Sequence, residues 1–206
     1  MKLDGARSGL DDDPYLWPGT DCLRNLLGIR DREEFHTAEH EVVRARRLQL
    51  DQEFLPGDYD TAHLRAFHQF LFQDVYDWAG RFREGDISKD GQPFCPAGEL
   101  ADRLDRLFAR VAARRLFVGM DWEQFIGSFA VLYGDLNAIH PFREGNGRTQ
   151  RAFLRQLAAN AGWTVDWSSL GRFANARACE RYTKKGKPHA LVRVLAPIVK
   201  PRAADG

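Results

Sequence analysis

The sequence predicts an all-α domain whose helices are interrupted by one short β-hairpin. Over most of the chain, apolar residues recur at steps of three and four, which is the spacing of one buried helix face. Only residues 86–94 depart from this pattern, because they alternate around Asp90-Gly91 as two strands joined by a tight turn do. A chain of 206 residues supports one full hydrophobic core and leaves little for a second, so we expect a single domain.

The domain is expected to extend over residues 20–200. Residues 1–19 are acidic and interrupted by proline and glycine, which predicts a lead-in or an arm lying on the domain. Residues 201–206 are expected to form a C-terminal tail. The formal net charge of +1 and the absence of a long apolar run indicate neither a nucleic-acid binder nor a membrane partner. The N-terminus has no apolar signal region, and three widely spaced cysteines fit reduced thiols, so we expect a cytoplasmic protein.

Three periodic segments predict the main helices of the bundle. The first is HLRAFHQFLFQDVYDWAG, for which we expect a helix that ends at Gly80. The apolar positions of the three segments are Leu64, Phe67, Leu71, Val75 and Trp78; then Leu100, Leu104, Leu107 and Val111; then Trp122, Phe125, Ile126, Phe129, Tyr133 and Leu136. We expect their aromatic residues to form core rather than a cofactor site.

The hairpin signal lies in GDISKDGQPFCP. Ile87 and Lys89 alternate before the turn, and Gln92 and Phe94 alternate after it. A lone hairpin in a helical protein has no larger sheet to join, so its free edge could receive an extended segment of a partner by strand addition. Taken alone, the segment could equally be a connecting loop.

The stretch HPFREGNGRTQR, residues 140–151, has the pattern of a loop that leads into a helix. Pro141 disfavours the helical conformation at His140 and so ends the preceding helix. Gly145 and Gly147 permit a turn before the next periodic segment begins. The start of that helix presents free backbone N–H groups and the positive end of the helix dipole, which together favour binding of phosphate oxygens.

The charged residues of this stretch complete a phosphate-transfer site. Arg148 and Arg151 lie three apart and share a helix face, where two guanidinium groups suit a polyphosphate. Glu144 offers a hard oxygen ligand for Mg²⁺, and His140 can act as a base. Each residue alone has an ordinary structural explanation: a loop histidine, a common turn, or solvated arginines. Their conjunction predicts transfer of a phosphorus group from a nucleotide to a hydroxyl, without the common GxxxxGK[ST] loop.

The stretch resembles the signature of Fic-domain proteins, HPFx[D/E]GNGRxxR, with every defined position present. FHQFLFQDVYDWAGRFREGDISKDGQPF is similar to the family's helix and target-docking flap. YLWPGTDCLRNLLGI is similar to the start of the class I Fic toxins (FicT type), which are inhibited by a separate small antitoxin. The resemblance implies the Fic fold, a helical bundle with a β-hairpin flap near the active site.

The resemblance also implies an activity and residue roles. A protein hydroxyl would attack the α-phosphate of ATP, AMP would be transferred and pyrophosphate would leave. His140 would be the base, Glu144 would bind Mg²⁺, and Phe142 would anchor the loop in the core. Gly145, Asn146 and Gly147 would form the anion hole, and Arg148 and Arg151 would bind the β- and γ-phosphates. The flap that docks the target would comprise Ile87, Ser88, Lys89, Asp90, Gly91, Gln92, Pro93 and Phe94.

Regulation and target are likewise expectations from the resemblance. The inhibitory [S/T]xxxE[G/N] motif of many Fic proteins is missing; residues 37–42 come nearest, with Val42 where glycine or asparagine is required. An antitoxin would therefore supply the inhibitory glutamate in trans, opposite Arg151. The class implies a tyrosine of the B-type subunits of DNA gyrase and topoisomerase IV as the target, with a GTPase as the alternative. Kinase-like members carry lysine in place of the second glycine, so Gly147 favours adenylylation, although transfer of other nucleotides, phosphocholine or a phosphoryl group stays open.

Two interpretations compete with the adenylyltransferase. HTAEH, residues 36–40, matches the HxxEH pattern of a zinc metalloprotease, while its helical spacing also fits an ordinary solvated helix face. The second is a non-catalytic scaffold that only binds a partner, against which the intact set of site residues argues. The basic stretch KKGKPH near the C-terminus is typical of a solvated surface.

Overall fold

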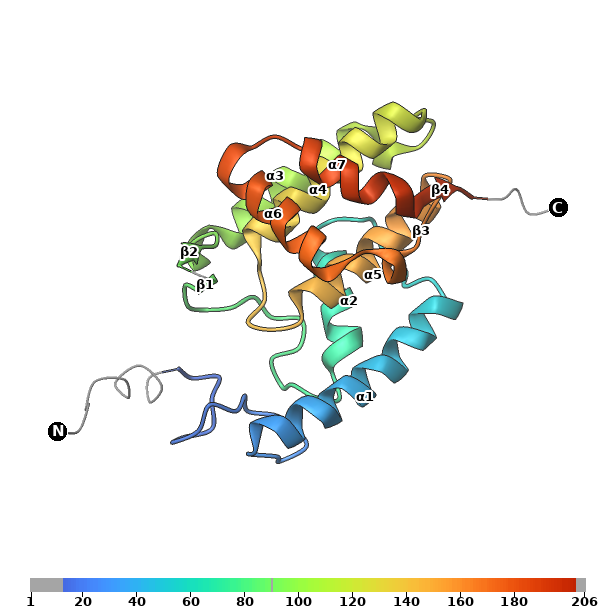
Figure 1. Ribbon diagram of the computed structural model, residues 1–206. Helices are drawn as coiled ribbons and strands as arrows, with labels where there is room; N and C mark the ends of the chain where they lie inside the picture. Colours follow the sequence, from blue (N-terminus) through green and yellow to red (C-terminus); the bar gives the residue numbers. More distant parts are fainter. Residues whose placement is uncertain (1–12, 90, 203–206) are drawn as a thin grey trace.

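The computed structural model describes residues 13–89 and 91–202, and these contain seven α-helices and two small antiparallel strand pairs (Figure 1). The α-helices are α1 (Arg32–Gln52), α2 (Thr61–Phe72), α3 (Leu100–Ala113), α4 (Trp122–Ile139), α5 (Asn146–Asn160), α6 (Arg172–Lys185) and α7 (His189–Leu195). The strands are β1 (Ser88–Lys89), β2 (Gln92–Pro93), β3 (Trp163–Val165) and β4 (Val199–Pro201). Short 3₁₀ helices cover Ala97–Glu99, Arg115–Phe117, Trp167–Ser169 and Ala196–Ile198. The predicted all-α class is confirmed.

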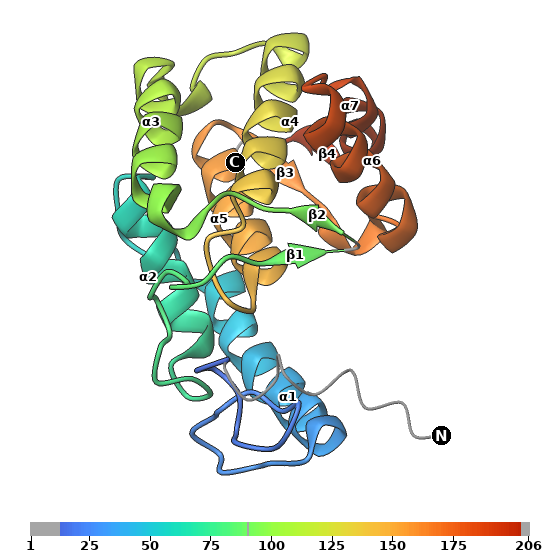
Figure 2. The same cartoon turned by 90° about the vertical axis from the view of Figure 1, so that its left-hand side faces the viewer.

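Helix α5 lies at the centre of the molecule. It packs against α2, α4 and β3, while α6 and α7 pack against α4, and α1 packs on α2 (Figures 1 and 2). Helices α4 and α5 together bury a largely apolar set of side chains, including Phe125, Phe129, Phe153 and Leu157. Asp121 begins α4 with a reciprocal capping box, which stabilises the helix that leads into the loop at residues 140–145.

The predicted helices beginning at residues 100 and 122 are confirmed, whereas α2 is shorter than expected. It ends at Phe72 rather than near Gly80, and residues 73–80 form tight turns. The N–H groups of Val75 and Tyr76 both donate to the carbonyl of Phe72, at 2.9 Å each. These turns keep Val75 and Trp78 buried. The spacing of these two apolar residues therefore reflects their burial in the core and does not indicate that the helix continues.

The predicted hairpin is present in the described residues as β1 and β2, with Ser88 opposite Pro93 and Lys89 opposite Gln92 (Figure 2). Gly91 has a φ of 76°, as such a turn requires, and Asp90 lies outside the described residues. The second strand pair, β3 with β4, was not predicted. It joins residues that are distant in the sequence, and strands of three residues are too short to show a period.

Residues 13–31 form an irregular segment against the domain. Leu16 is buried and forms an isolated bridge with Leu23, and the indole N–H of Trp17 donates to the carbonyl of Ile29 at 3.0 Å. The remainder of the predicted lead-in, residues 1–12, lies outside the described residues, as do residues 203–206. Within the described ranges, no helix has the length and apolar character needed to cross a membrane.

Candidate active site

The loop between α4 and α5 is held by hydrogen bonds from a buried asparagine. The side chain of Asn146 accepts from the N–H of Phe142 at 2.9 Å and donates to the carbonyl of Phe142 at 2.7 Å. Phe142 is buried and its ring stacks on His68 with centroids 3.9 Å apart. Asn146 thus closes the loop into a compact turn, and Phe142 fixes that turn on the core.

His68, which sequence reasoning missed, supports the same loop from α2. The N–H of Gly80 donates to its Nδ1 at 2.8 Å, so Nε2 carries the ring proton and donates to the carbonyl of Glu144, 3.1 Å away. Burial lowers the pKa of His68 to about 3. The hydrogen bond to Glu144 opposes this shift, and the positive charge of Arg148 adds to it. The buried ring is therefore neutral at physiological pH.

Glycine is required where α5 begins. Gly145 has a φ of 80°, and a Cβ built there would lie 2.4 Å from the ring of Phe72. Gly145 is also the N-cap of α5 and has no side chain to cap the first turn. A Cβ at Gly147 would lie 3.3 Å from Nη1 of Arg151. The N–H of Gly145 donates to the carboxylate of Glu144 at 2.7 Å, whereas no side chain of the N-cap residue competes for the N–H groups of the first helical turn, which can face an anion.

His140 ends α4 in the left-handed conformation, with φ 49° and ψ 63°. Its Nδ1 lies 3.2 Å from the carbonyl of Asn137, and because a carbonyl only accepts, Nδ1 carries the proton and Nε2 keeps its lone pair. The ring of Phe94 stacks on the imidazole, with centroids 4.0 Å apart and planes at 16°. Burial lowers the pKa of His140 to about 4; the bond to Asn137 opposes this shift, while Arg83 and Lys89 reinforce it.

Arg83, also missed from the sequence, fastens the base of the hairpin to the same loop. Its buried guanidinium donates to the carbonyls of His140 at 2.9 Å and Gly85 at 2.8 Å, and also to that of Cys95. Its backbone N–H donates to the carbonyl of Pro141 at 2.9 Å. One arginine thus connects the two ends of the hairpin segment to the end of α4.

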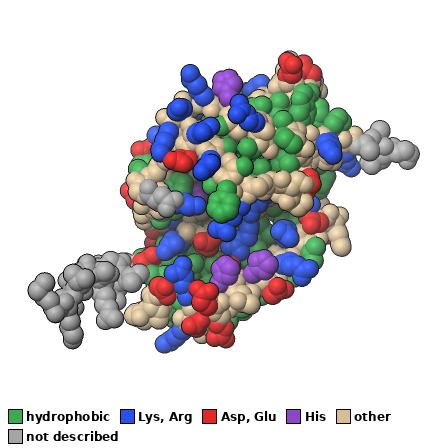
Figure 3. Space-filling model, in the orientation of Figure 1, with side chains coloured by type: hydrophobic (Ala, Val, Ile, Leu, Met, Phe, Trp, Pro, Cys, Tyr) green, Lys and Arg blue, Asp and Glu red, His purple; other side chains and the backbone are tan. Residues whose placement is uncertain are grey.

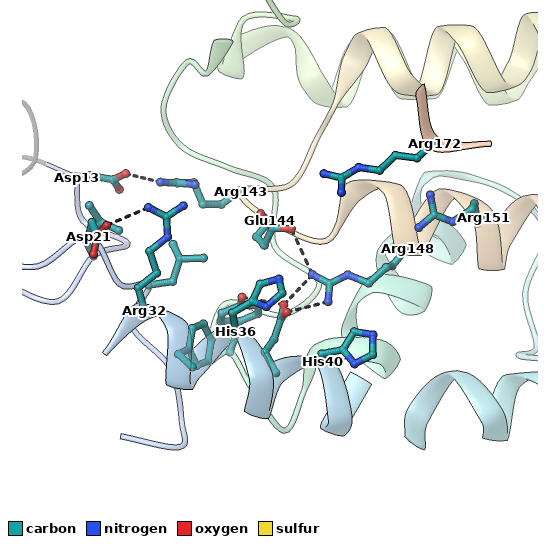
Figure 4. Close-up of a pocket in the computed structure, with 15 residues that line it drawn as sticks. Asp13, Asp21, Arg32, His36, His40, Arg143, Glu144, Arg148, Arg151 and Arg172 are labelled. Carbon is teal, nitrogen blue, oxygen red and sulfur yellow. Dashed lines mark hydrogen bonds and ion pairs between the residues drawn. The ribbon is translucent and has the colours of Figure 1, made fainter. Parts of the chain in front are cut away.

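The two arginines of the sequence motif differ in their surroundings (Figure 4). Arg148 makes a bidentate ion pair with Glu39 of α1, at 2.9 and 2.7 Å, and also donates to Glu144 at 3.2 Å. Across the described residues, the guanidinium of Arg151 has no hydrogen bond or ion pair, and burial lowers its pKa. A half-buried cation without a counter-charge is a favourable place for an anionic ligand.

Both arginines line two adjoining cavities of about 770 Å³ and about 630 Å³. Glu144 and Arg143 border the larger cavity, and Arg172 borders both. In the space-filling view, arginine, lysine and histidine side chains gather around a hollow between the two halves of the molecule (Figure 3). His140 and residues 145–147 do not line these cavities; Phe94 covers the imidazole of His140 instead.

The HxxEH segment does not assemble a zinc site. His36 and His40 are exposed, whereas Glu39 between them is buried and bound to Arg148 and to the hydroxyl of Tyr76. No group of three or more histidine, cysteine or acidic residues in the described part of the chain could hold a metal ion. The structure gives the zinc interpretation no support.

Comparison with known proteins gives a consistent result. Residues 58–158 match the model of the Fic/DOC family. The chain is 36% identical over 162 residues to "Probable protein adenylyltransferase Fic" of Escherichia coli K12, covering 79% of this chain and 80% of that protein. It is 37% identical over 167 residues to "Protein adenylyltransferase VbhT" of Bartonella schoenbuchensis, covering 81% of this chain but only 35% of that longer protein.

The solved structures agree with this result. The crystal structure of the BepC protein of Bartonella tribocorum with bound AMPPNP has a TM-score of 0.86 and 26% identity, over 91% of this chain and 97% of that one. The type IV secretion system effector BepA has a TM-score of 0.82 and 30% identity, over 91% of this chain and 68% of that one.

Proposed function

Because this chain belongs to the Fic/DOC family, we propose that it is a protein adenylyltransferase that transfers AMP from ATP to a hydroxyl of a target protein. Relatives that bear this activity in their names match most of the chain. The observation that carries the proposal is the position of His140, a neutral imidazole with a free Nε2, on the loop that opens into the uncapped start of α5.

In the proposed reaction, Nε2 of His140 takes the proton of the target hydroxyl while the Nδ1–H group continues to donate to the carbonyl of Asn137. The hydroxyl oxygen then bonds to the α-phosphorus of ATP, and the bond from that phosphorus to the β-phosphate's bridging oxygen breaks. Pyrophosphate carries away the electron pair. The first-turn N–H groups of α5, with Arg148 and Arg151, would stabilise the charge on the phosphates.

Glu144 fits the role of Mg²⁺ ligand. Its carboxylate is partly exposed, borders the larger cavity and lies beside Arg148, where the phosphates would bind. Mg²⁺ is usually held by one or two carboxylates together with substrate phosphates, and it would offset the charge of the leaving pyrophosphate.

The hairpin β1–β2 is proposed to dock the target. It is a sheet of two strands with no third strand beside it in the described part of the chain, so its edge can pair with an extended segment. We propose that the target is the B-type subunit of DNA gyrase and of topoisomerase IV, modified on a tyrosine, because the N-terminal segment resembles the class I toxins. A GTPase is the alternative target.

The same class implies that the protein is a cytoplasmic toxin restrained by a small antitoxin. The chain lacks the inhibitory motif, and Glu41, the nearest candidate, is exposed and pairs with Arg44 and His40. Arg151 is open to a glutamate supplied in trans. If the isolated protein were inactive with ATP and Mg²⁺, and a small partner increased its activity, this regulation would be refuted.

The test is ATP-dependent labelling in bacterial lysate. Wild type, His140→Ala and the matched control His189→Ala, which alters an exposed histidine far along the chain, are incubated with ATP labelled on the α-phosphate. We expect labelling by wild type and His189→Ala only, and mass spectrometry should find AMP on a topoisomerase subunit. Equal labelling by a folded His140→Ala protein would refute the role of His140. Absence of label together with a phosphate-sized mass gain on the subunit would mean kinase chemistry, because the label on the α-phosphate would stay with ADP.

A further inference from the structure

Glu39 occupies a position of α1 where an apolar residue is expected. Phe35 and Val43, one turn to either side, are buried core residues, and Glu39 itself is only 5% exposed. A carboxylate is rarely buried to this extent unless its charge is paired and its oxygens accept hydrogen bonds. Its partners therefore indicate what it does.

Those partners connect α1 to the phosphate-binding end of α5. The hydroxyl of buried Tyr76 donates to Glu39 at 3.1 Å, and Arg148 donates to both carboxylate oxygens. Arg148 in turn donates to Glu144 and stacks over the ring of Phe72, 4.7 Å from its centroid. Figure 4 shows the chain of contacts from α1 through Arg148 to Glu144.

The geometry leaves Arg148 able to bind a ligand while it is paired. Glu39 engages two of the N–H groups of the guanidinium and Glu144 engages a third, so others remain for a phosphate oxygen. The bidentate pair also fixes the plane of the guanidinium. Without that pair, the flexible side chain would lose conformational entropy when a ligand orders it. Glu39 is thus placed to orient Arg148 rather than to block it.

We propose that Glu39 is a positioning residue: it holds Arg148 in the orientation that receives the β-phosphate, and through Arg148 it places the carboxylate of Glu144. This inference rests on the proposed function. It gives the two motif arginines different roles. Arg148 is held in place by a carboxylate of its own chain, whereas Arg151 is left for the ligand or for an inhibitor.

The test measures binding of ATP, ADP and AMP by calorimetry, together with the ATP-dependent labelling rate. In Glu39→Gln we expect ATP and ADP to bind about tenfold or more weakly, the size of a lost charge-assisted contact. AMP has no β-phosphate, so its binding should change less than about twofold. Glu39→Asp should recover part of the loss, and the matched control Glu41→Gln, on the exposed face of α1, should behave as wild type.

Three outcomes would overturn the inference. Unchanged ATP binding and rate in Glu39→Gln would leave Glu39 without a role, an equal loss for AMP would make its role merely structural, and a faster labelling rate would make it an inhibitor. Should Glu39→Gln fail to fold, Tyr76→Phe keeps the carboxylate and removes one of its hydrogen bonds, and the same selective loss for ATP over AMP is expected. Failure of wild type to bind ATP or to label any protein would instead refute the proposed function.

Discussion

At the scale of single residues, the decisive property of His140 is its charge. A base must be neutral to accept a proton, and an imidazole with the ordinary pKa of about 6.5 would be partly protonated at mildly acidic pH. Stacking under Phe94 shields the partly buried ring from water, and the nearby charges of Arg83 and Lys89 disfavour a further positive charge. The fold therefore keeps the imidazole of His140 neutral, which is the form that the proposed base requires.

We predict that His140 remains neutral well below pH 6. Because its folded-state pKa is lowered to about 4, the proton is lost as pH rises through about 4, and the imidazole is neutral throughout the range from 5 to 8. The check is an NMR titration of the imidazole in the ligand-free protein, with His140→Ala identifying the resonance. A midpoint near 6.5 would show that the ring is solvated and that Phe94 does not cover it.

At the scale of secondary structure, the start of α5 depends on one backbone conformation. Gly145 must have positive φ so that the chain can leave the loop and enter the helix, and its position against Phe72 leaves no room for a side chain. The hydrogen bond from the N–H of Thr149 to the carbonyl of Gly145 at 3.0 Å begins the helix from this residue. The conformation of this turn and its packing against α2 therefore depend on each other.

We predict that Gly145→Ala lowers the free energy of unfolding by about 2 kcal/mol, because it adds backbone strain and an overlap with Phe72. It should also reduce labelling strongly, since the turn must move. Denaturant unfolding provides the measurement. The matched control is Gly127→Ala within α4, where a Cβ meets nothing within 4 Å and should stabilise the helix by about 0.5–1 kcal/mol. A Gly145→Ala protein as stable as wild type would contradict the strained turn.

At the scale of the whole molecule, the buried neutral histidine His68 makes the free energy of unfolding depend on pH. His68 lies where α2, the turns of residues 73–80 and the loop between α4 and α5 meet, and it hydrogen-bonds to Gly80 and Glu144. When the chain unfolds, the imidazole regains its ordinary pKa near 6.5. The unfolded state therefore binds a proton between pH 6.5 and about 3 that the folded state does not.

We predict that stability falls as pH drops below about 6.5 and continues to fall towards pH 3. A lowered folded-state pKa of a histidine gives this sign, and one such group contributes a slope of up to about 1.4 kcal/mol per pH unit. Denaturant unfolding between pH 7 and 5 measures the slope for wild type and for His68→Gln, which retains an amide donor for the carbonyl of Glu144. An identical slope in the two proteins would show that His68 is not the group responsible.

The sequence alone determined the features that are local along the chain. The buried faces of α3 and α4, the hairpin turn at Gly91 and the loop that opens α5 were all predicted, because each depends on residues within one or two turns of one another. The prediction that the loop binds phosphate is local in the same sense, since the glycines, Arg148 and Arg151 lie in a single short segment.

Only the tertiary structure decided which groups meet from distant segments. Glu39 reaches Arg148 across 109 positions, Arg83 reaches His140 across 57, and His68 reaches Glu144 across 76. No period or motif marks such pairs, and in the sequence Glu39 looks like one more acidic residue of a solvated helix. Burial lowers the pKa of His140 and of His68, and it makes a counter-charge necessary for Glu39. These effects arise only once the helices have packed, so the sequence alone does not reveal them.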